Sequence, residues 1–239
     1  MRFEDLSWAA VCFYYRSMGD RKYCKIMADK DLLARLKTDP LSVPEKEFEQ
    51  KVILDYVNVS SYDLLYKSRM SRKILDMLSE NKGIIANLRN IDIIDCNLSD
   101  DIITRDIMRI YRAMLSVDGL WATGASKILH ILNSSLFAPI NQSITDCFRI
   151  YPEHEGYVSW LRIVQKNALE AVFDYKETHK SGDPSDFLSR SLHYDRCGFH
   201  KSIVKYIDEY YWLTVGDKLP IPPLWAPEFN YENVSHSKK

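Results

Sequence analysis

Apolar residues recur along most of the chain at the three- and four-residue spacing that is typical of amphipathic α-helices. Near the N-terminus, Leu6, Ala9 and Phe13 show this spacing within residues 4–18. The same pattern predicts helices over 29–37, 44–56, 70–81, 83–88, 99–116, 124–133, 142–150, 156–175, 186–192 and 198–212. With 8 Gly, 9 Pro and few long β-branched alternations, a many-turned β-sandwich is not expected. We therefore predict an all-α fold with no substantial sheet.

The chain shows no internal repeat and no low-complexity linker. We therefore expect residues 1–218 to form one compact helical domain, with two lobes that meet near the middle of the chain as the alternative. The tail 219–239 is rich in proline, which excludes a helix through its first half. We expect Leu224, Trp225 and Phe229 to anchor this tail across the body before it frays.

The overall composition is that of an ordinary globular protein, with 46% hydrophobic and 27% charged residues. The chain is too apolar and too aromatic for a disordered protein. Its 32 basic and 33 acidic residues give a net charge of −1, which excludes a protein that coats nucleic acid by charge alone. A site-sized patch of positive charge remains compatible with that balance.

Five cysteines are present, an odd number without a CxxC pair, which excludes a zinc ribbon and a thioredoxin-type motif. No four of them are closely spaced, so an iron–sulfur cluster is not expected either. The N-terminus carries Glu4, Asp5 and Arg16, and it is predicted to be an amphipathic helix instead of a secretory leader. No run approaches the roughly 18 apolar residues of a membrane span. We expect a cytoplasmic protein with no membrane contact and no cofactor.

Residues 105–146 carry the most informative pattern, two helices joined by a short turn that contains glycine. The helix–hairpin–helix covers 105–133, and Gly124 is expected to open its second helix. Because glycine has no Cβ, backbone N–H groups at that helix N-terminus can approach a phosphate. Elements of this kind bind the DNA backbone without reading its sequence.

This segment resembles the helix–hairpin–helix superfamily of DNA glycosylases, in its 8-oxoguanine glycosylase-like branch. The family hairpin runs Leu-Pro-Gly-hydrophobic-Gly, a lysine follows on the next helix, and Pro-hydrophobic-Asp caps a later helix. The corresponding residues here are 120–124, Lys127 and 139–141. The run GASKILHILNSSLFAP is also similar to uncharacterised bacterial and archaeal proteins of this fold. That second likeness covers about 50–215, whereas the glycosylase likeness covers about 105–146.

Three positions depart from the glycosylase pattern. Asn141 stands where the family has a carboxylate near the scissile sugar, and an amide is a poor base at physiological pH. Lys127 lies one residue after the family's nucleophile position, which is Ser126 here, and one residue rotates a helical side chain by about 100°. Trp121 and Ala122 replace the Pro and the first Gly of the hairpin.

The resemblance implies that Lys127 is an amine nucleophile that forms a Schiff base with deoxyribose. That role requires a pKa lowered by burial or by a nearby cation. The alternative is a partly exposed lysine that contacts phosphate or only solvates its helix. Asn141 orients substrate in one interpretation and is a plain helix N-cap in the other, which we favour. Asp146 lies one turn further along. In one interpretation it supplies a catalytic carboxylate, and in the other its carboxylate only lies on the helix surface.

Two regions are candidates for contact with DNA. In the hairpin, we expect Trp121, Thr123, Gly124 and Ser126 to face the duplex. Residues 66–73 carry four bases and no acid, and from this patch we expect phosphate contacts by Lys67, Arg69 and Arg72. The alternative for this patch is a solvated helix start. Three further bases, spaced to share one side of the helix before the hairpin, are Arg105, Arg109 and Arg112.

Two histidine patterns are candidates for a functional site. His193, Cys197 and His200, with Asp195, have the spacing of metal ligands, but nothing else in the chain supplies a matching pair. We therefore expect no metal site. His130 lies three residues after Lys127, so it either tunes that lysine or is a satisfied core residue.

The leading hypothesis is a protein that binds double-stranded DNA and acts as a glycosylase or abasic lyase on a flipped, damaged base. The alternative is a catalytically inactive helical interaction protein that retains the fold. A third class is a small-molecule or nucleotide enzyme that uses the same cleft.

Overall fold

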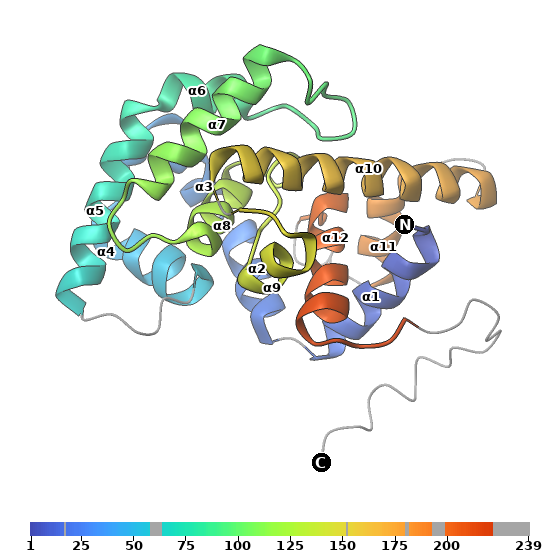
Figure 1. Ribbon diagram of the computed structural model, residues 1–239. Helices are drawn as coiled ribbons and strands as arrows, with labels where there is room; N and C mark the ends of the chain where they lie inside the picture. The colour runs from blue at the N-terminus through green and yellow to red at the C-terminus, as the bar shows by residue number, and fades with distance from the viewer. Residues whose placement is uncertain (17, 58–63, 152, 180–181, 193–198, 222–239) are drawn as a thin grey trace.

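The computed structural model describes residues 1–16, 18–57, 64–151, 153–179, 182–192 and 199–221, and within these residues it contains helices and no strand (Figure 1). The predicted all-α class is therefore confirmed. The α-helices are α1 (Phe3–Arg16), α2 (Met18–Ala28), α3 (Lys30–Thr38), α4 (Glu45–Phe48), α5 (Leu64–Glu80), α6 (Lys82–Leu88), α7 (Asp101–Leu115), α8 (Ala122–Leu132), α9 (Gln142–Phe148), α10 (His154–His179), α11 (Pro184–Ser191) and α12 (Ile203–Tyr211). A 3-10 turn, η1 (Pro40–Ser42), and two π-helical segments, η2 (Glu49–Val57) and η4 (Trp212–Gly216), complete the described elements.

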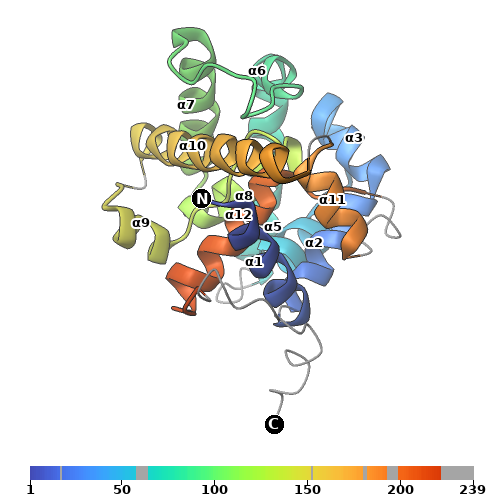
Figure 2. The ribbon, with the colours of Figure 1, turned by 90° about the vertical axis from the view of Figure 1, so that its right-hand side faces the viewer.

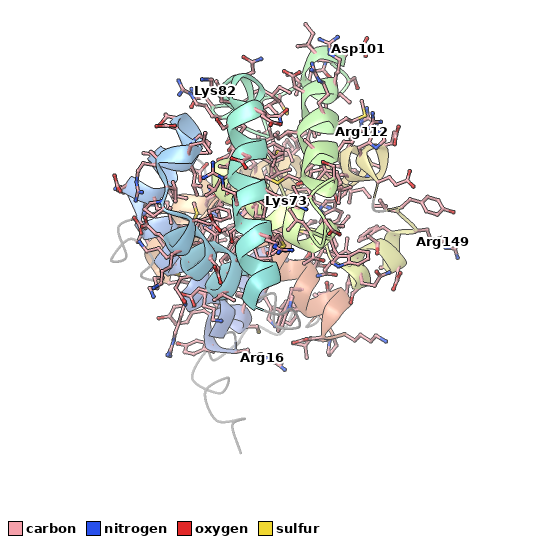
Figure 3. The ribbon with its side chains drawn as sticks, turned by 90° about the vertical axis from the view of Figure 1, so that its left-hand side faces the viewer. Arg16, Lys73, Lys82, Asp101, Arg112 and Arg149 are labelled. Atoms are coloured by element: carbon pink, nitrogen blue, oxygen red, sulfur yellow. The ribbon has the colours of Figure 1, made fainter. Side chains whose placement is uncertain are left out.

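The longest helix, α10, crosses the molecule, with α6 and α7 on one side and α1, α11 and α12 on the other (Figures 1 and 2). Near its start, the ring of Tyr157 stacks on Tyr111 of α7, with ring centroids 4.0 Å apart. Near its end, Tyr175 packs edge-on against Phe3 of α1 at 4.7 Å. One large cluster of buried apolar side chains includes residues from α1 to α12. α5 and α7 lie side by side on the face shown in Figure 3.

Several helix boundaries follow capping residues. Asp100 caps α7, because its carboxylate accepts hydrogen bonds from the backbone N–H groups of Ile102 and Ile103. Asp183 caps α11, which therefore starts at Pro184, two residues before the predicted start. Ser202 accepts from the N–H of Lys205, so α12 starts five residues later than predicted.

Three further helical regions differ from the prediction. α5 begins at Leu64, six residues before its predicted start. The apolar pattern does not predict α2. Among its described side chains, Tyr23 and Ile26 are buried, Cys24 and Met27 are partly buried, and charged residues lie between them. The stretch 176–186 was predicted as a loop, but α10 continues to His179. Leu224, Trp225 and Phe229, the proposed anchors of the tail, lie outside the described residues. Within the described part of the chain, no helix has the length and apolar character needed to cross a membrane.

Candidate functional site

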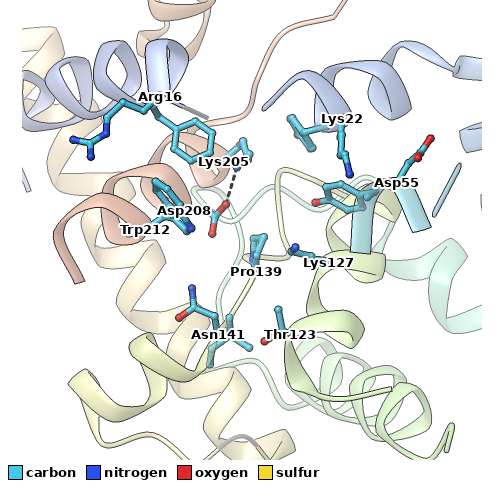
Figure 4. A pocket seen from close by; sticks show the side chains of 14 residues that line it. Arg16, Lys22, Asp55, Thr123, Lys127, Pro139, Asn141, Lys205, Asp208 and Trp212 are labelled. Carbon is cyan, nitrogen blue, oxygen red and sulfur yellow. Dashed lines mark hydrogen bonds and ion pairs between the residues drawn. The ribbon is translucent and has the colours of Figure 1, made fainter. Parts of the chain in front are cut away.

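A cleft with a volume of about 640 Å³ lies where residues of the hairpin helix α8 meet residues of α1, α2 and α12 (Figure 4). Lys127 and Asn141, two residues that the sequence assigned to one site, both line it. Its other charged lining residues are the cations Arg16, Lys22 and Lys205 and the anions Asp55 and Asp208. Four cations against two anions give the cleft an excess of positive charge.

The side chain of Lys127 extends from α8 into this cleft (Figure 4). It makes no hydrogen bond and no ion pair with the residues that the structure describes, and its ammonium lies 5.7 Å from the centre of the Tyr56 ring. Burial lowers the pKa of Lys127, with Lys205 and Lys22 adding to this effect, while the carboxylate of Asp208 opposes it. The lowered pKa is the property that the nucleophilic role requires.

Asp208 is the functional candidate that sequence reasoning missed. It belongs to α12 and lies across the cleft from Lys127 (Figure 4). The ammonium Nζ of Lys205 donates to its Oδ2 at 2.7 Å. In the sequence, this pair has the ordinary three-residue spacing of surface ion pairs, so nothing marks it as part of a site.

A buried chain of charges continues behind Asp208. Nζ of Lys205 also lies 3.5 Å from Oε1 of Glu209, and Nζ of Lys201 donates to the same oxygen at 2.7 Å. The side chains of Lys201 and Glu209 are both 0% exposed. The ammonium of Lys205 also lies 4.9 Å from the ring centre of Phe13. This network fixes the position of Lys205 and thereby the position of the Asp208 carboxylate.

Asn141 caps α9, since its Oδ1 accepts a hydrogen bond from the N–H of Ile144 at 3.0 Å. The N-cap interpretation is therefore confirmed. Because the oxygen is engaged in the cap, the amide nitrogen is the group left to face the cleft, and among the described residues it has no partner. At this position the protein offers a hydrogen-bond donor where the glycosylase pattern has a carboxylate.

The loop that carries Asn141 is tied to the core by buried hydrogen bonds. The hydroxyl of Tyr157 donates to the carbonyl of Ala138 at 3.0 Å, and Nε1 of Trp160 donates to the carbonyl of Pro139 at 3.1 Å. The N–H of Ile140 donates to Oγ of Ser126 at 3.0 Å. Ser126 was predicted to face DNA, but its fully buried hydroxyl serves this loop instead. Its proposed role as a DNA contact is therefore wrong.

Gly124 also has a different role from the one predicted. It is the third residue of α8 and not its opening residue, and it is buried. A Cβ at this position would lie 2.7 Å from Cδ1 of Leu120 and 3.3 Å from Cγ1 of Val57. The glycine therefore permits close packing of the hairpin on η2 instead of an approach of phosphate to its Cα. The left-handed turn residue of the hairpin is Gly119, with φ of 81°.

Two hairpin residues remain accessible to a ligand. Trp121, which precedes the first residue of α8, is 73% exposed. Thr123 lines the cleft. The hairpin therefore presents a large aromatic side chain close to the residues that surround Lys127.

Asp146 does not belong to the cleft. It is exposed on α9, and Nε2 of Gln142 donates to its Oδ1 at 2.6 Å. The structure therefore favours the helix-surface carboxylate over the catalytic one.

None of the described side chains of the basic patch on α5 lines the cleft. Arg69 and Arg72 are exposed, and Nε of Arg72 lies 3.1 Å from Oδ1 of Asp76. The side chain of Lys67 lies outside the described residues. Lys73 extends from the same helix on the face that Figure 3 shows. This patch can contact a ligand only on the outer surface.

His130 is a core residue, as one of the two interpretations held. It is fully buried, its Nδ1 lies 2.5 Å from the carbonyl oxygen of Phe137, and its Nε2 lies 3.2 Å from the hydroxyl of Tyr23. Burial lowers its pKa to about 4, so the ring is neutral near pH 7. Through Tyr23, which lines the cleft, His130 helps to shape the site.

Of the four residues with metal-ligand spacing, only His200 is described, because His193, Asp195 and Cys197 lie outside the described residues. Oδ1 of Asp186 lies 3.0 Å from Nδ1 of His200. Elsewhere in the part of the chain that the structure describes, no three His, Cys, Asp or Glu side chains gather in a way that could hold a metal ion.

Comparison with known proteins adds no assignment to this geometry. No protein family, no curated protein and no solved structure was found to match the chain.

Proposed function

We propose that the protein binds double-stranded DNA and uses Lys127 as an amine nucleophile on a nucleotide extruded into the cleft. The observation that carries the proposal is a half-buried lysine with a lowered pKa and no ion pair among the described residues, in a cleft with an excess of positive charge. Volumes of roughly 300–1,000 Å³ are typical of ligand pockets, and the 640 Å³ of this cleft falls in that range. The resemblance of the hairpin to DNA glycosylases selects DNA as the ligand.

In this proposal, neutral Nζ of Lys127 attacks C1′ of the extruded nucleotide. The N–C1′ bond forms, the glycosidic bond breaks, and the base leaves with the bonding electron pair and takes a proton from water. Nζ then loses a proton to the carboxylate of Asp208. The sugar ring opens as the nitrogen lone pair forms the C=N bond and the C1′–O4′ bond breaks, and O4′ takes the proton back from Asp208, which leaves a protonated Schiff base. With an abasic sugar, the amine and the C1′ aldehyde give the same Schiff base and water.

The remaining groups of the cleft have binding roles in this proposal. The Asn141 amide donates a hydrogen bond to the sugar or the base, while Tyr56 and Trp212 supply aromatic faces for the base. Lys22 and Arg16, both exposed at the cleft, attract the flanking phosphates. Trp121 of the hairpin contacts the duplex beside the extruded nucleotide.

The test is borohydride trapping on a duplex with one abasic site. Wild-type protein should form a covalent adduct, and Lys127→Gln should not. Lys176→Gln is the matched control, because it removes the same charge from an exposed position on α10 that does not line the cleft, and it should retain the adduct. Absence of an adduct with wild type, or an undiminished adduct with Lys127→Gln, would overturn the lyase chemistry.

One observation favours a second candidate, a relative that keeps the fold without the chemistry. Asn141 places an amide donor where the glycosylases have a carboxylate, so that charge is missing beside the sugar. If no adduct is trapped, a measurement of duplex binding distinguishes a DNA-binding protein from a helical interaction protein. Binding that falls steeply with salt and weakens in Trp121→Ala indicates a DNA-binding protein, and no binding at low salt indicates a helical interaction protein.

A further inference from the structure

A second hollow, of about 210 Å³, lies between α7 and the first turn of α10. None of the residues that line it lines the Lys127 cleft. Arg105, Arg109 and Arg112 come from α7, and His154 and Glu155 come from α10. Figure 3 shows the outer face of α7, where Arg112 is labelled. The three arginines that share one side of their helix in the sequence therefore surround a concave site.

The positive charge of this hollow is not neutralised within the described structure. Arg105 and Arg109 are exposed and make no hydrogen bond or ion pair with any described residue. The guanidinium of Arg112 contacts Nε2 of His154, and Oε1 of Glu155 lies 2.8 Å from the same nitrogen. Glu155 is the single carboxylate among the described lining residues, so the guanidinium groups exceed the carboxylates by two.

The acidic residues of α7 leave this excess in place. Asp106 is buried, and Nδ2 of Asn87 donates to its Oδ2 at 3.3 Å, so it points away from the arginine side. Asp101, one turn before Arg105, makes no ion pair with it in the described structure. Like charges three and four residues apart on one helix face are destabilising, so the arrangement is one that a bound anion would stabilise.

We infer that this arginine hollow binds a phosphate group. The planar forks of arginine match the oxygen atoms of phosphate in two-point hydrogen bonds, which lysine does not reproduce. The hollow lies at the N-terminal end of α10, where the helix dipole also favours negative charge. Its 210 Å³ corresponds to the volume of about seven water molecules, enough for a phosphate group and part of its hydration shell.

The phosphate can belong to a nucleic-acid backbone or to a free phosphorylated small molecule. The site does not depend on the chemistry of Lys127, because the two sets of lining residues are separate. A Lys127→Gln protein should therefore bind phosphate as well as wild type does. This expectation separates a failure of the proposed catalysis from a failure of the phosphate site.

The first arm of the experiment uses inorganic phosphate and pyrophosphate as probes, with sodium chloride at matched ionic strength as the reference. Thermal unfolding should shift to higher temperature with the phosphates, and Arg109→Gln should lose most of that shift. Lys176→Gln is the matched control, since this exposed residue lies on the same α10, roughly 33 Å along the helix from His154. Equal shifts in wild type and Arg109→Gln, or no shift in wild type, would overturn the inference.

The second arm of the experiment identifies the source of the phosphate. It applies when phosphate stabilises the wild-type protein and Arg109→Gln loses that effect. Affinity for a short duplex is measured over a series of salt concentrations. If Arg109→Gln weakens duplex binding and lowers the salt slope by about one, while Lys176→Gln does not, the hollow holds a backbone phosphate. If the duplex affinity is unchanged although Arg109→Gln abolishes the phosphate shift, the hollow holds a free phosphorylated molecule.

Discussion

Lys205 and Asp208 form an ion pair at the wall of the cleft, with Nζ and Oδ2 2.7 Å apart, and this pair faces the half-buried amine of Lys127 (Figure 4). Lys205 lowers the pKa of Lys127, and Asp208 raises it. The pair therefore acts on the lysine in both directions, and Asp208 also offers an acceptor for the proton that a nucleophilic amine must lose.

The first prediction concerns the carboxylate of this pair. Asp208→Asn removes the charge that favours the protonated form of Lys127, so the pKa of Lys127 should fall further. NMR titration of the lysine after reductive ¹³C-methylation measures it directly. Asp55→Asn, at the same cleft, is the control and should leave the pKa of Lys127 nearly unchanged. If the pKa of Lys127 does not change in Asp208→Asn, the Asp208 carboxylate does not influence the protonation of this lysine.

A second prediction tests the buried charges behind the cleft. Glu209→Gln removes the buried carboxylate that lies against both Lys201 and Lys205, which should lower the free energy of unfolding by about 3–5 kcal/mol. The double variant Lys201→Met/Glu209→Leu removes the two fully buried charges together and should lose much less, because the remaining ammonium of Lys205 keeps Asp208 as its partner. Urea unfolding measures both. A double variant that is no more stable than the single one would contradict this account.

Acid sensitivity gives a third prediction, through His130. In the unfolded chain this histidine takes up a proton below about pH 6.5, whereas in the folded protein it does so only near pH 4. The unfolded state therefore binds more protons between these values, and stability should decrease as the pH falls from 6.5 to 4. The loss from this residue is about 3 kcal/mol. In His130→Gln, the slope of stability against pH should be smaller in that window, and an identical slope would show that His130 does not titrate this way.

The close packing of the hairpin gives a fourth prediction. Gly124→Ala should lower the free energy of unfolding by about 1 kcal/mol, since a crowded methyl group at 2.7 Å from Leu120 outweighs the gain in helix propensity. Gly83→Ala is the matched control in α6, where a Cβ meets nothing within 4 Å, and it should stabilise the protein by about 0.5 kcal/mol. If both substitutions stabilise equally, Gly124 is not packed as described.

Much of the fold could be predicted from the sequence, because most helices bury one apolar face and their period is local information. α7 shows this best, with Asp100 as its cap and Ile107, Ile110 and Met114 buried along one face. α2 could not be predicted in this way, since its two buried residues, Tyr23 and Ile26, are separated and flanked by charged residues. Its position depends on packing against η2, which no local pattern shows.

The candidate site could be predicted only in part. Lys127 and Asn141 were placed in one site from a motif, and both line the cleft. Asp208 and Trp212 come from a helix about 80 residues further along, and only the folded chain brings them to the same cleft. Ser126 was misassigned because a motif does not distinguish a buried hydroxyl that binds a loop from an exposed one that binds a ligand.

The central claim is that Lys127 is the reactive amine of the cleft, and mapping the site of borohydride attachment tests it most directly. Wild-type protein is trapped on an abasic duplex, digested and sequenced by mass spectrometry. The account predicts that the reduced sugar adduct is carried by the peptide that contains Lys127. An adduct on Lys22 or Lys205 in place of Lys127, or no adduct on any lysine, would contradict it.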